Sequence, residues 1–242
     1  MQKDQKLDLS NAGLKELPAD LFERVELRFL NAYQNEVSFV PPEIGRLASL
    51  ETVILANNRL TKLPEQFGLL VQLKTLDLGH NQIAELPGSF ANLENLSDYL
   101  YLHDNRLQTL PEGIFERLTK LRYLNLSDNP LQHLPESLGA LASLEEVRLE
   151  NISLEKIPAW IGRLRRLDEI ALRNNQLTAL PESMGALREL TRLDLRGNRF
   201  RSIPDWLAAL PKLRKLDLRW NPLTRGCKAI HELQSRGCRV LT

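Results

Sequence analysis

Four residues in the middle of the sequence combine histidine with carboxylate at a regular spacing. His80 and His103 are 23 residues apart, and Asp104 and Asp128 are 24 apart. Imidazole nitrogens and carboxylate oxygens bind zinc, and a histidine beside a carboxylate can also transfer protons near neutral pH. Spacing alone is weak evidence for either activity. We therefore expect polar residues at the rim of a surface, with no metal site, no cofactor and no catalytic residue.

Other sequence signatures of catalysis point the same way. The chain has no glycine-rich phosphate loop, no nucleophile elbow and no paired-cysteine metal motif. Its two cysteines, Cys227 and Cys238, flank an expected helix that would hold them about 15 Å apart, which is too far for a disulfide. Unpaired cysteines fit a reducing compartment. The sequence thus favours a protein that is not an enzyme.

Aromatic residues show a second kind of spacing. In the stretch LSDYLYLHDN, residues 96–105, the side chains of Tyr99, Tyr101 and His103 alternate with two leucines. A period of two is typical of a strand with one buried and one exposed face. The leucines would face the core, so the aromatic side chains would face outward. Whether they form a binding surface depends on what the neighbouring strands present.

These residues lie within an internal repeat. The stretches LKTLDLGHNQIAELPGSFANL from Leu73, LRYLNLSDNPLQHLPESLGAL from Leu121 and LTRLDLRGNRFRSIPDWLAAL from Leu190 share the template LxxLxLxxNxLxxLPxxLxxL. Ten units, most of them 23 residues long, cover almost the whole chain. Their ninth position is occupied by Ala12, Asn35, Asn58, Asn81, Asn105, Asn129, Ile152, Asn175, Asn198 and Asn221.

The template has a direct physical interpretation. A unit this short cannot bury its leucines at positions 1, 4, 6 and 11 alone, so the units must stack and share one core. The asparagine amide at position 9 can bond backbone groups that are left unpaired where the chain leaves the strand. Proline at position 15 suits an extended segment that enters a short helical turn. The pattern predicts a parallel sheet on one side of a solenoid.

The template resembles the leucine-rich repeat family, in the 23-residue class of Ras-suppressor-like, Scribble-like and bacterial leucine-rich repeat proteins. The resemblance implies an α/β solenoid, built as a right-handed horseshoe with a parallel concave β-sheet. It also implies short helical or 3-10 segments on the convex side and a helical C-terminal cap. By analogy the ligand would be a protein, such as a small GTPase, a phosphatase or a signalling complex.

One unit inside the stack breaks the template. Ile152 replaces the asparagine at position 9, and Asn151 comes one place early. Backbone groups that lose an amide partner cost about 1 to 3 kcal/mol when nothing else bonds them. We expect a soft point in the solenoid at Ile152.

The domain organisation follows from where the template stops. Residues 1–223 are expected to form ten repeats, and residues 224–242 a capping segment. In that segment Ile230 and Leu233 would share one helical face, and Gly237 is the expected C-cap.

Composition limits the setting of the protein. The 242 residues, 43% hydrophobic and 26% charged, suffice for one large soluble domain. The first ten residues are charged where a signal peptide is apolar, and no stretch approaches the roughly 18 apolar residues of a membrane span. We expect a cytoplasmic protein without a membrane partner, while secretion as an effector stays open.

Charge is distributed unevenly along the chain. The net charge of +1 is too small to make nucleic acid the default partner. Residues 1–121 carry 12 Lys and Arg against 17 Asp and Glu, whereas residues 122–242 carry 20 against 14. The two halves of the solenoid should therefore differ in electrostatic sign.

The exposed strand positions 3, 5 and 7 would line the concave face, with position 8 beside them. All four tyrosines fall on this face, and tyrosine, tryptophan and arginine often carry the binding energy of interfaces. The sequence predicts a partner-binding surface with an aromatic centre and an arginine-rich C-terminal end. Its residues are Phe29, Tyr33, Tyr99, Tyr101, His103, Tyr123, Arg148, Arg173, Arg196, Arg219 and Trp220.

The favoured function is a non-catalytic protein-protein interaction module that binds through its concave face. Aromatic residues also favour strands for their own sake, and the arginines stand near Glu150, Asp194 and Asp217, which could neutralise them. The alternative is an architectural or self-associating scaffold, in which a concave-face dimer replaces the expected monomer. Nucleic-acid or acidic-ligand binding by the basic half is less favoured, because interleaved acids repel phosphate.

Overall fold

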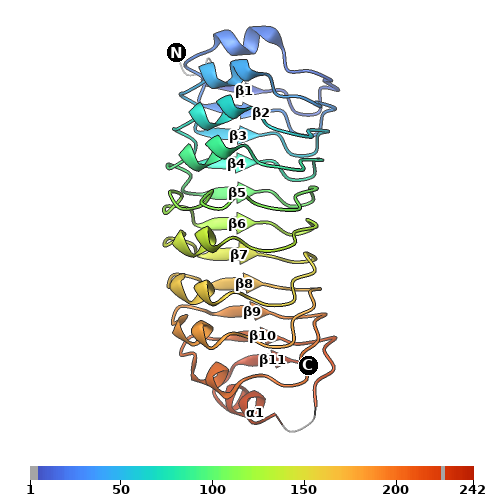
Figure 1. Cartoon of the computed structure of the whole chain (residues 1–242), viewed down its shortest axis with the longest axis vertical. Coiled ribbons are helices and arrows are strands. Elements are labelled where there is room, and N and C mark those ends of the chain that lie inside the picture. The colour runs from blue at the N-terminus through green and yellow to red at the C-terminus, as the bar shows by residue number, and fades with distance from the viewer. Residues whose placement is uncertain (1–4, 225–226) are drawn as a thin grey trace.

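The computed structural model describes residues 5–224 and 227–242. Within these ranges the chain forms a right-handed solenoid around one parallel sheet, whose eleven strands are paired in sequence order (Figure 1). The start of the first expected repeat, residues 1–4, and residues 225 and 226 of the expected capping segment lie outside the described residues. The predicted horseshoe with a parallel concave sheet is confirmed.

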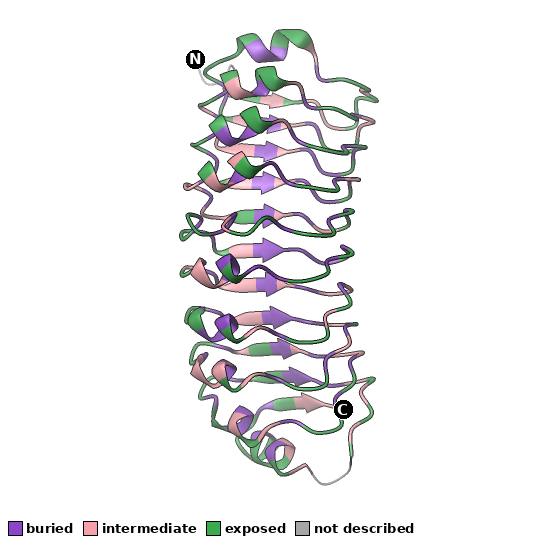
Figure 2. Cartoon of the chain, in the orientation of Figure 1, coloured by how far each residue is buried: buried purple, intermediate pink, exposed green. Residues whose placement is uncertain are grey.

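Each strand contains three residues. The strands are β1 (Lys6–Asp8), β2 (Phe29–Asn31), β3 (Thr52–Ile54), β4 (Thr75–Asp77), β5 (Tyr99–Tyr101), β6 (Tyr123–Asn125), β7 (Glu146–Arg148), β8 (Glu169–Ala171), β9 (Arg192–Asp194), β10 (Lys215–Asp217) and β11 (Arg239–Leu241). Position 4 of the template is in register along the sheet, so that Leu100 of β5 lies between Leu76 and Leu124. These central side chains are fully buried, and Figure 2 shows the buried centre repeated from strand to strand.

Short 3-10 helices cover the opposite side of the core. They are η2 (Ala19–Glu23), η3 (Pro42–Arg46), η4 (Glu65–Leu69), η5 (Gly88–Asn92), η6 (Glu136–Ala140), η7 (Ala159–Arg163), η8 (Glu182–Ala186) and η9 (Asp205–Ala209). The template prolines stand at their start, as Pro64 does with φ −74° and ψ 154°. Between β5 and β6, residues 112–117 form turns in place of a 3-10 helix. The predicted extended entry into a short helical turn is confirmed.

The asparagines of position 9 form a ladder beside the sheet. The Nδ2 atom of Asn58 donates to the carbonyl oxygens of Ala32 and Leu55 at 2.8 and 3.0 Å, and its Oδ1 atom accepts from the N–H of Val37 at 3.0 Å. The same bonds recur around Asn129, whose Oδ1 accepts from Leu107. Each amide therefore joins two repeats, which explains the selection for asparagine.

The ladder is interrupted at Ile152. This side chain is buried and cannot accept a hydrogen bond. An asparagine at position 152 would accept a hydrogen bond from the N–H of Leu131 in the preceding repeat, as the other asparagines of the ladder do. In this chain the N–H of Leu131 has no acceptor among the described residues. The interface between the sixth and seventh repeats thus lacks the position-9 amide bonds of its neighbours, and the amide of Asn151 instead donates across it to Asp128 at 2.7 Å.

The C-terminal end combines a helix with an additional strand. Helix α1 (Lys228–Ser235) packs against η9 and buries Leu233, and Gly237 follows it with φ +83°. The chain then forms β11, which pairs with β10 and extends the sheet. The sequence predicts the helix and its C-cap but gives no sign of this last strand. Among the described residues, no helix is long and apolar enough to span a membrane.

Candidate functional site

Three tyrosines form a continuous cluster on the concave face, which we call the aromatic centre: Tyr99 and Tyr101 of β5 and Tyr123 of β6. Tyr99 pairs in register with Tyr123 across the two strands. The ring centroids lie 5.7 Å apart for Tyr99 and Tyr101, 5.5 Å for Tyr99 and Tyr123, and 4.9 Å for Tyr101 and Tyr123. Tyr99 remains 46% exposed, so the cluster is open to solvent at this residue.

The electrostatic surroundings of the aromatic centre disfavour ionised phenols. Burial raises the pKa of Tyr123 to about 12, against the opposing charge of Arg148. Burial likewise raises the pKa of Tyr101, and the charges of Asp77 and Glu146 add to the effect. Tyr101 and Tyr123 therefore stay neutral and can donate hydrogen bonds from their hydroxyl groups at physiological pH.

The histidines lie at the edge of this cluster. The ring of His103 contacts Tyr101, with centroids 5.9 Å apart, and covers Gly79, where a Cβ atom would lie 2.3 Å from its Cε1. The Nδ1 atom of His80 lies 2.5 Å from Oδ2 of Asp104. Burial lowers the pKa of His103, and the charge of His80 lowers it further. A neutral His103 thus extends the aromatic surface.

The fourth member of the histidine-carboxylate set points elsewhere. Asp128 accepts a hydrogen bond from Asn151 at 2.7 Å. Among the described residues, no group of three or more histidine, cysteine, aspartate or glutamate side chains is arranged to hold a metal ion. The set is therefore split between a histidine pair with Asp104 and a separate contact of Asp128.

Two of the predicted aromatic residues lie apart from this cluster. Phe29 belongs to β2 and Tyr33 follows it, so β3 and β4 separate both from β5. The hydroxyl of Tyr33 accepts a hydrogen bond from Nδ2 of Asn57 at 3.2 Å. The fold therefore brings together three of the four tyrosines and His103, and leaves the fourth tyrosine and Phe29 as separate contacts on the same face.

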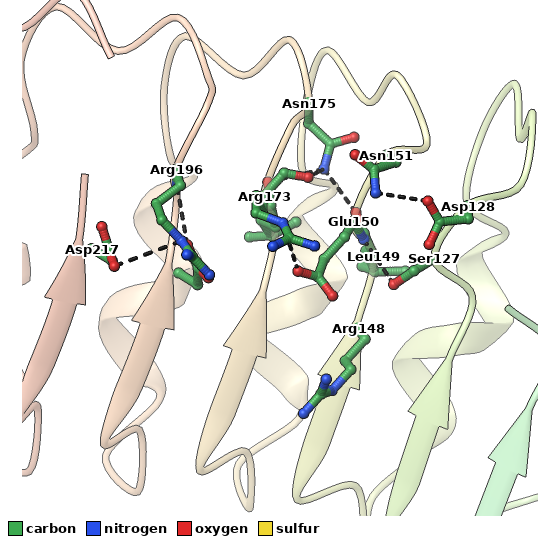
Figure 3. A network of polar contacts seen from close by, with 12 residues as sticks. Ser127, Asp128, Arg148, Leu149, Glu150, Asn151, Arg173, Asn175, Arg196 and Asp217 are labelled. Carbon is green, nitrogen blue, oxygen red and sulfur yellow. Dashed lines mark hydrogen bonds and ion pairs between the residues drawn. The ribbon is translucent and has the colours of Figure 1, made fainter. Parts of the chain in front are cut away.

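A second group, which we call the arginine end, consists of Arg173, Arg196 and Arg219. Each arginine faces a carboxylate on the same surface. Arg173 pairs with Glu150 at 3.2 Å, and Arg196 lies 3.6 Å from Asp217 (Figure 3). Arg196 also donates to Asp194, and Arg219 pairs with Asp217 at 2.7 Å. The guanidinium groups are thus engaged within the face itself.

Asp217 is the buried member of this network, with only 1% of its surface exposed. Burial opposes its ionisation, but the hydrogen bonds and charge of Arg219, with the charge of Arg196, outweigh burial and lower its pKa. The carboxylate therefore stays ionised and fixes two arginines in place.

Two more predicted residues border these groups. Arg148 pairs with Glu146 at 2.7 Å and lies 5.8 Å from the ring centroid of Tyr123, so it belongs to the rim of the aromatic centre. Trp220 is 70% exposed, and the guanidinium of Arg219 lies 5.6 Å from its ring centroid. Trp220 thus forms the outer edge of the arginine end.

Acidic residues beside the aromatic centre were missed from the sequence. A cavity of about 940 Å³ opens next to Tyr99 and Tyr123. Its lining includes two arginines, Arg122 and Arg166, and five carboxylates: Asp98, Glu145, Glu146, Asp168 and Glu189. The sequence signal for these residues is the recurrence of acidic residues at template positions 2 and 3. The exposed strand positions 3, 5 and 7 include only some of them.

Comparison with known proteins agrees with this architecture. A family model described as leucine-rich repeat region matches residues 100–236, and a second, leucine rich repeat, matches residues 48–98. A search of curated protein sequences gives no match.

Solved structures with the same fold are numerous. A leucine-rich repeat protein of Leptospira interrogans is 31% identical with a TM-score of 0.92 over 98% of this chain and 60% of its own. The ectodomain of the Arabidopsis thaliana receptor kinase GASSHO1/SCHENGEN3, solved in complex with CASPARIAN STRIP INTEGRITY FACTOR 2, is 34% identical with a TM-score of 0.79. That match covers 90% of this chain and 27% of the receptor chain.

A third similar structure is that of the plant peptide hormone receptor RGFR1 in complex with RGF2. It is 28% identical with a TM-score of 0.78, over 90% of this chain and 36% of its own. The chain thus spans less than two thirds of the length of each of these proteins.

Proposed function

The chain belongs to the leucine-rich repeat family, and from this premise we propose that it is a non-catalytic module that binds a protein partner on its concave face. The fold is commonly a scaffold for protein interaction, and two of the similar structures are receptor complexes, one with CASPARIAN STRIP INTEGRITY FACTOR 2 and one of a peptide hormone receptor with RGF2. What supports the concave face in this chain is one observation. Three tyrosine rings are in mutual contact on the concave sheet, and one of them, Tyr99, is left 46% exposed.

Tyrosine clusters of this kind suit an interface. Each ring offers a large contact area with two rotatable bonds, and its hydroxyl provides directional hydrogen bonding. The rings of the aromatic centre pack against one another, so a partner would meet a surface that is largely preorganised. We assign the centre of the contact to Tyr99, Tyr101 and Tyr123, and give His103, Arg148 and the arginine end the role of rim.

Catalysis is not part of the proposal. The concave sheet is open, and the cavity beside the aromatic centre is lined by charged groups, among which Arg122 pairs with Glu145, while Glu189 pairs with Lys212 outside the lining. Open sites of this kind do not exclude water from a reacting atom, which most enzymes need.

The test compares capture of partners from the source lysate by the wild-type chain and by a Tyr99→Ala, Tyr101→Ala double variant, followed by titration of any captured protein. Truncation of a hot-spot tyrosine costs about 2 kcal/mol of binding or more. A Leu69→Ala variant is the matched control, because Leu69 is 54% exposed on η4 and contributes apolar surface on the convex side. Thermal denaturation checks that every variant is folded.

The outcomes separate the candidate roles. Loss of binding in the double variant with retention in Leu69→Ala supports the concave site. Full affinity in a folded double variant contradicts it and moves attention to the convex side. A dimer that sedimentation detects in the wild type and that Tyr101→Ala abolishes would instead assign the aromatic centre to self-association.

A further inference from the structure

The cavity beside the aromatic centre has an acidic lining. Carboxylates outnumber guanidinium groups by five to two among its residues. Asp77 lies on the other side of the cluster, in register with Tyr101, and is partly buried. The rings of the aromatic centre therefore stand between carboxylates on two sides.

Pairing within the cavity leaves one carboxylate available. Both terminal oxygens of Glu145 accept from Arg122, at 3.1 and 2.9 Å, and Glu189 pairs with Lys212 at 2.6 Å. Asp98, by contrast, accepts a hydrogen bond from the hydroxyl of Ser97 at 3.2 Å and has no ion pair among the described residues. Asp98 directly precedes Tyr99, so a free carboxylate stands beside the most exposed ring.

Carboxylates next to the aromatic centre also act on Tyr101. Burial is the main cause of its raised pKa, and the charges of Tyr99, Asp77 and Glu146 raise this pKa further. At Tyr123 the charge of Arg148 acts against that of Glu146. The face of a tyrosine ring attracts cations in its own right.

The arginine end does not offer the opposite preference. Its guanidinium groups are paired with Glu150, Asp194 and Asp217, so an anionic ligand would have to displace these contacts. Within the cavity Arg166 opposes a cation, and it has no ion pair among the described residues. Asp98 rather than Arg166 directly precedes the exposed Tyr99, so charge complementarity beside this ring favours a cationic occupant over an anionic one.

We propose that the partner segment which occupies this cavity is basic, and that a lysine or arginine side chain lies against Tyr99 and Tyr123 with its charge beside Asp98. This inference rests on the proposed function, because it names the chemistry of the partner at the same surface. Lysine and arginine have long side chains that end in a cation. One such side chain can therefore contact a tyrosine ring and a neighbouring carboxylate at the same time.

Short labelled peptides test the occupant directly. Fluorescence anisotropy compares an arginine-glycine repeat, a lysine-glycine repeat and a glutamate-glycine repeat, all blocked at both ends. We expect the two basic peptides to bind and the acidic one to fail. Tyr99→Ala and Asp98→Asn should each weaken the arginine peptide by about fivefold, as a lost cation–π contact or ion pair would.

The control for net charge is Glu16→Gln. Glu16 is exposed in the first repeat, and its removal changes the total charge as Asp98→Asn does. We expect unchanged binding in this variant. Equal weakening in Asp98→Asn and Glu16→Gln, stronger binding of the acidic peptide, or no detectable binding of basic peptides at millimolar concentration would each overturn the basic occupant.

The affinity of the captured partner for the variants distinguishes this inference from the proposed function. If the partner loses affinity for the Tyr99→Ala, Tyr101→Ala double variant but not for Asp98→Asn, the concave site stands and the basic occupant is wrong. If neither change matters, the concave site itself is wrong. Loss in both, with Glu16→Gln unaffected, supports the two proposals together.

Discussion

The aromatic centre, at template positions 3 and 5, and the arginine end, at position 7, lie on the same concave face, yet their side chains are used differently. At the arginine end every guanidinium meets a carboxylate from its own or an adjacent repeat. At the aromatic centre the rings contact each other and leave Tyr99 open to solvent. Residue types that are common in interfaces therefore do not alone mark free binding capacity, because partners on neighbouring strands can already satisfy them.

The two regions share what lies beneath them. Leu124 under the aromatic centre and Leu216 under the arginine end are both fully buried in the same register of the sheet. The two regions thus differ in the side chains of the concave face and not in the leucines beneath it, and substitutions can test that separation.

Core truncation should have the largest effect and should not distinguish the two regions. Leu124→Ala and Leu216→Ala should each lower the free energy of unfolding by about 2 to 5 kcal/mol, because each leaves a cavity in a packed core. Urea denaturation measures both. A cost for one variant well below this range would mean that the core beneath that region is not close-packed.

Loss of the buried carboxylate should destabilise the arginine end. Asp217→Asn removes a charged partner of Arg219 and Arg196 and should cost about 1 to 3 kcal/mol at neutral pH. Because the pKa of Asp217 is lowered in the folded state, its contribution is present above the unfolded pKa of about 3.9 and disappears as the pH falls through the folded value. Urea titrations across acid pH should show the difference between wild type and variant vanishing.

Asp77, the partly buried acid near the aromatic centre, should affect stability in the opposite direction as the pH changes. Burial raises the pKa of Asp77, against the hydrogen bond from the N–H of Gly79 and the charges of His103 and His80. The folded state therefore binds the proton more tightly, so this group reduces stability as the pH rises from about 3.9 through its folded pKa. Asp77→Asn keeps an acceptor for Gly79 and should be more stable than wild type at neutral pH by urea denaturation. A variant that is less stable than wild type would contradict this sign.

Surface truncation should have the smallest effect on stability. Tyr99→Ala and Arg173→Ala should each change the free energy of unfolding by less than about 1 kcal/mol, because both side chains point away from the core and surface ion pairs contribute little. Matched thermal and urea denaturation of the two variants would reveal any hidden structural role as a larger loss.

The repeat template explains why so much of the fold could be predicted. Leucine at position 4 and asparagine at position 9 each have one physical role, so their recurrence defines the sheet, its register and the exposed positions. Strand β11 was not predicted, because Arg239–Leu241 follows a helix and carries no template leucine before it. Its place depends on how α1 folds back on η9, which is a tertiary contact.

The candidate site could be predicted only in part. Adjacent template positions place Tyr99, Tyr101 and Tyr123 together, and the ring distances agree. The template positions do not determine which partner each charged residue takes, since Arg196 contacts both Asp194 of its own repeat and Asp217 of the next. The cavity that includes Asp98 is also lined by side chains from outside template positions 3, 5 and 7.

The missing amide at Ile152 has a consequence for cooperativity. In a stack where each repeat contacts only its neighbours, stability is a chain of pairwise couplings, and opening begins where a coupling is weakest. The junction between the sixth and seventh repeats lies between the aromatic centre and the arginine end. We expect hydrogen exchange to spread outward from this junction as well as inward from the ends of the solenoid. The concave face would then consist of two blocks that open separately, so a partner that contacts both blocks would couple their unfolding.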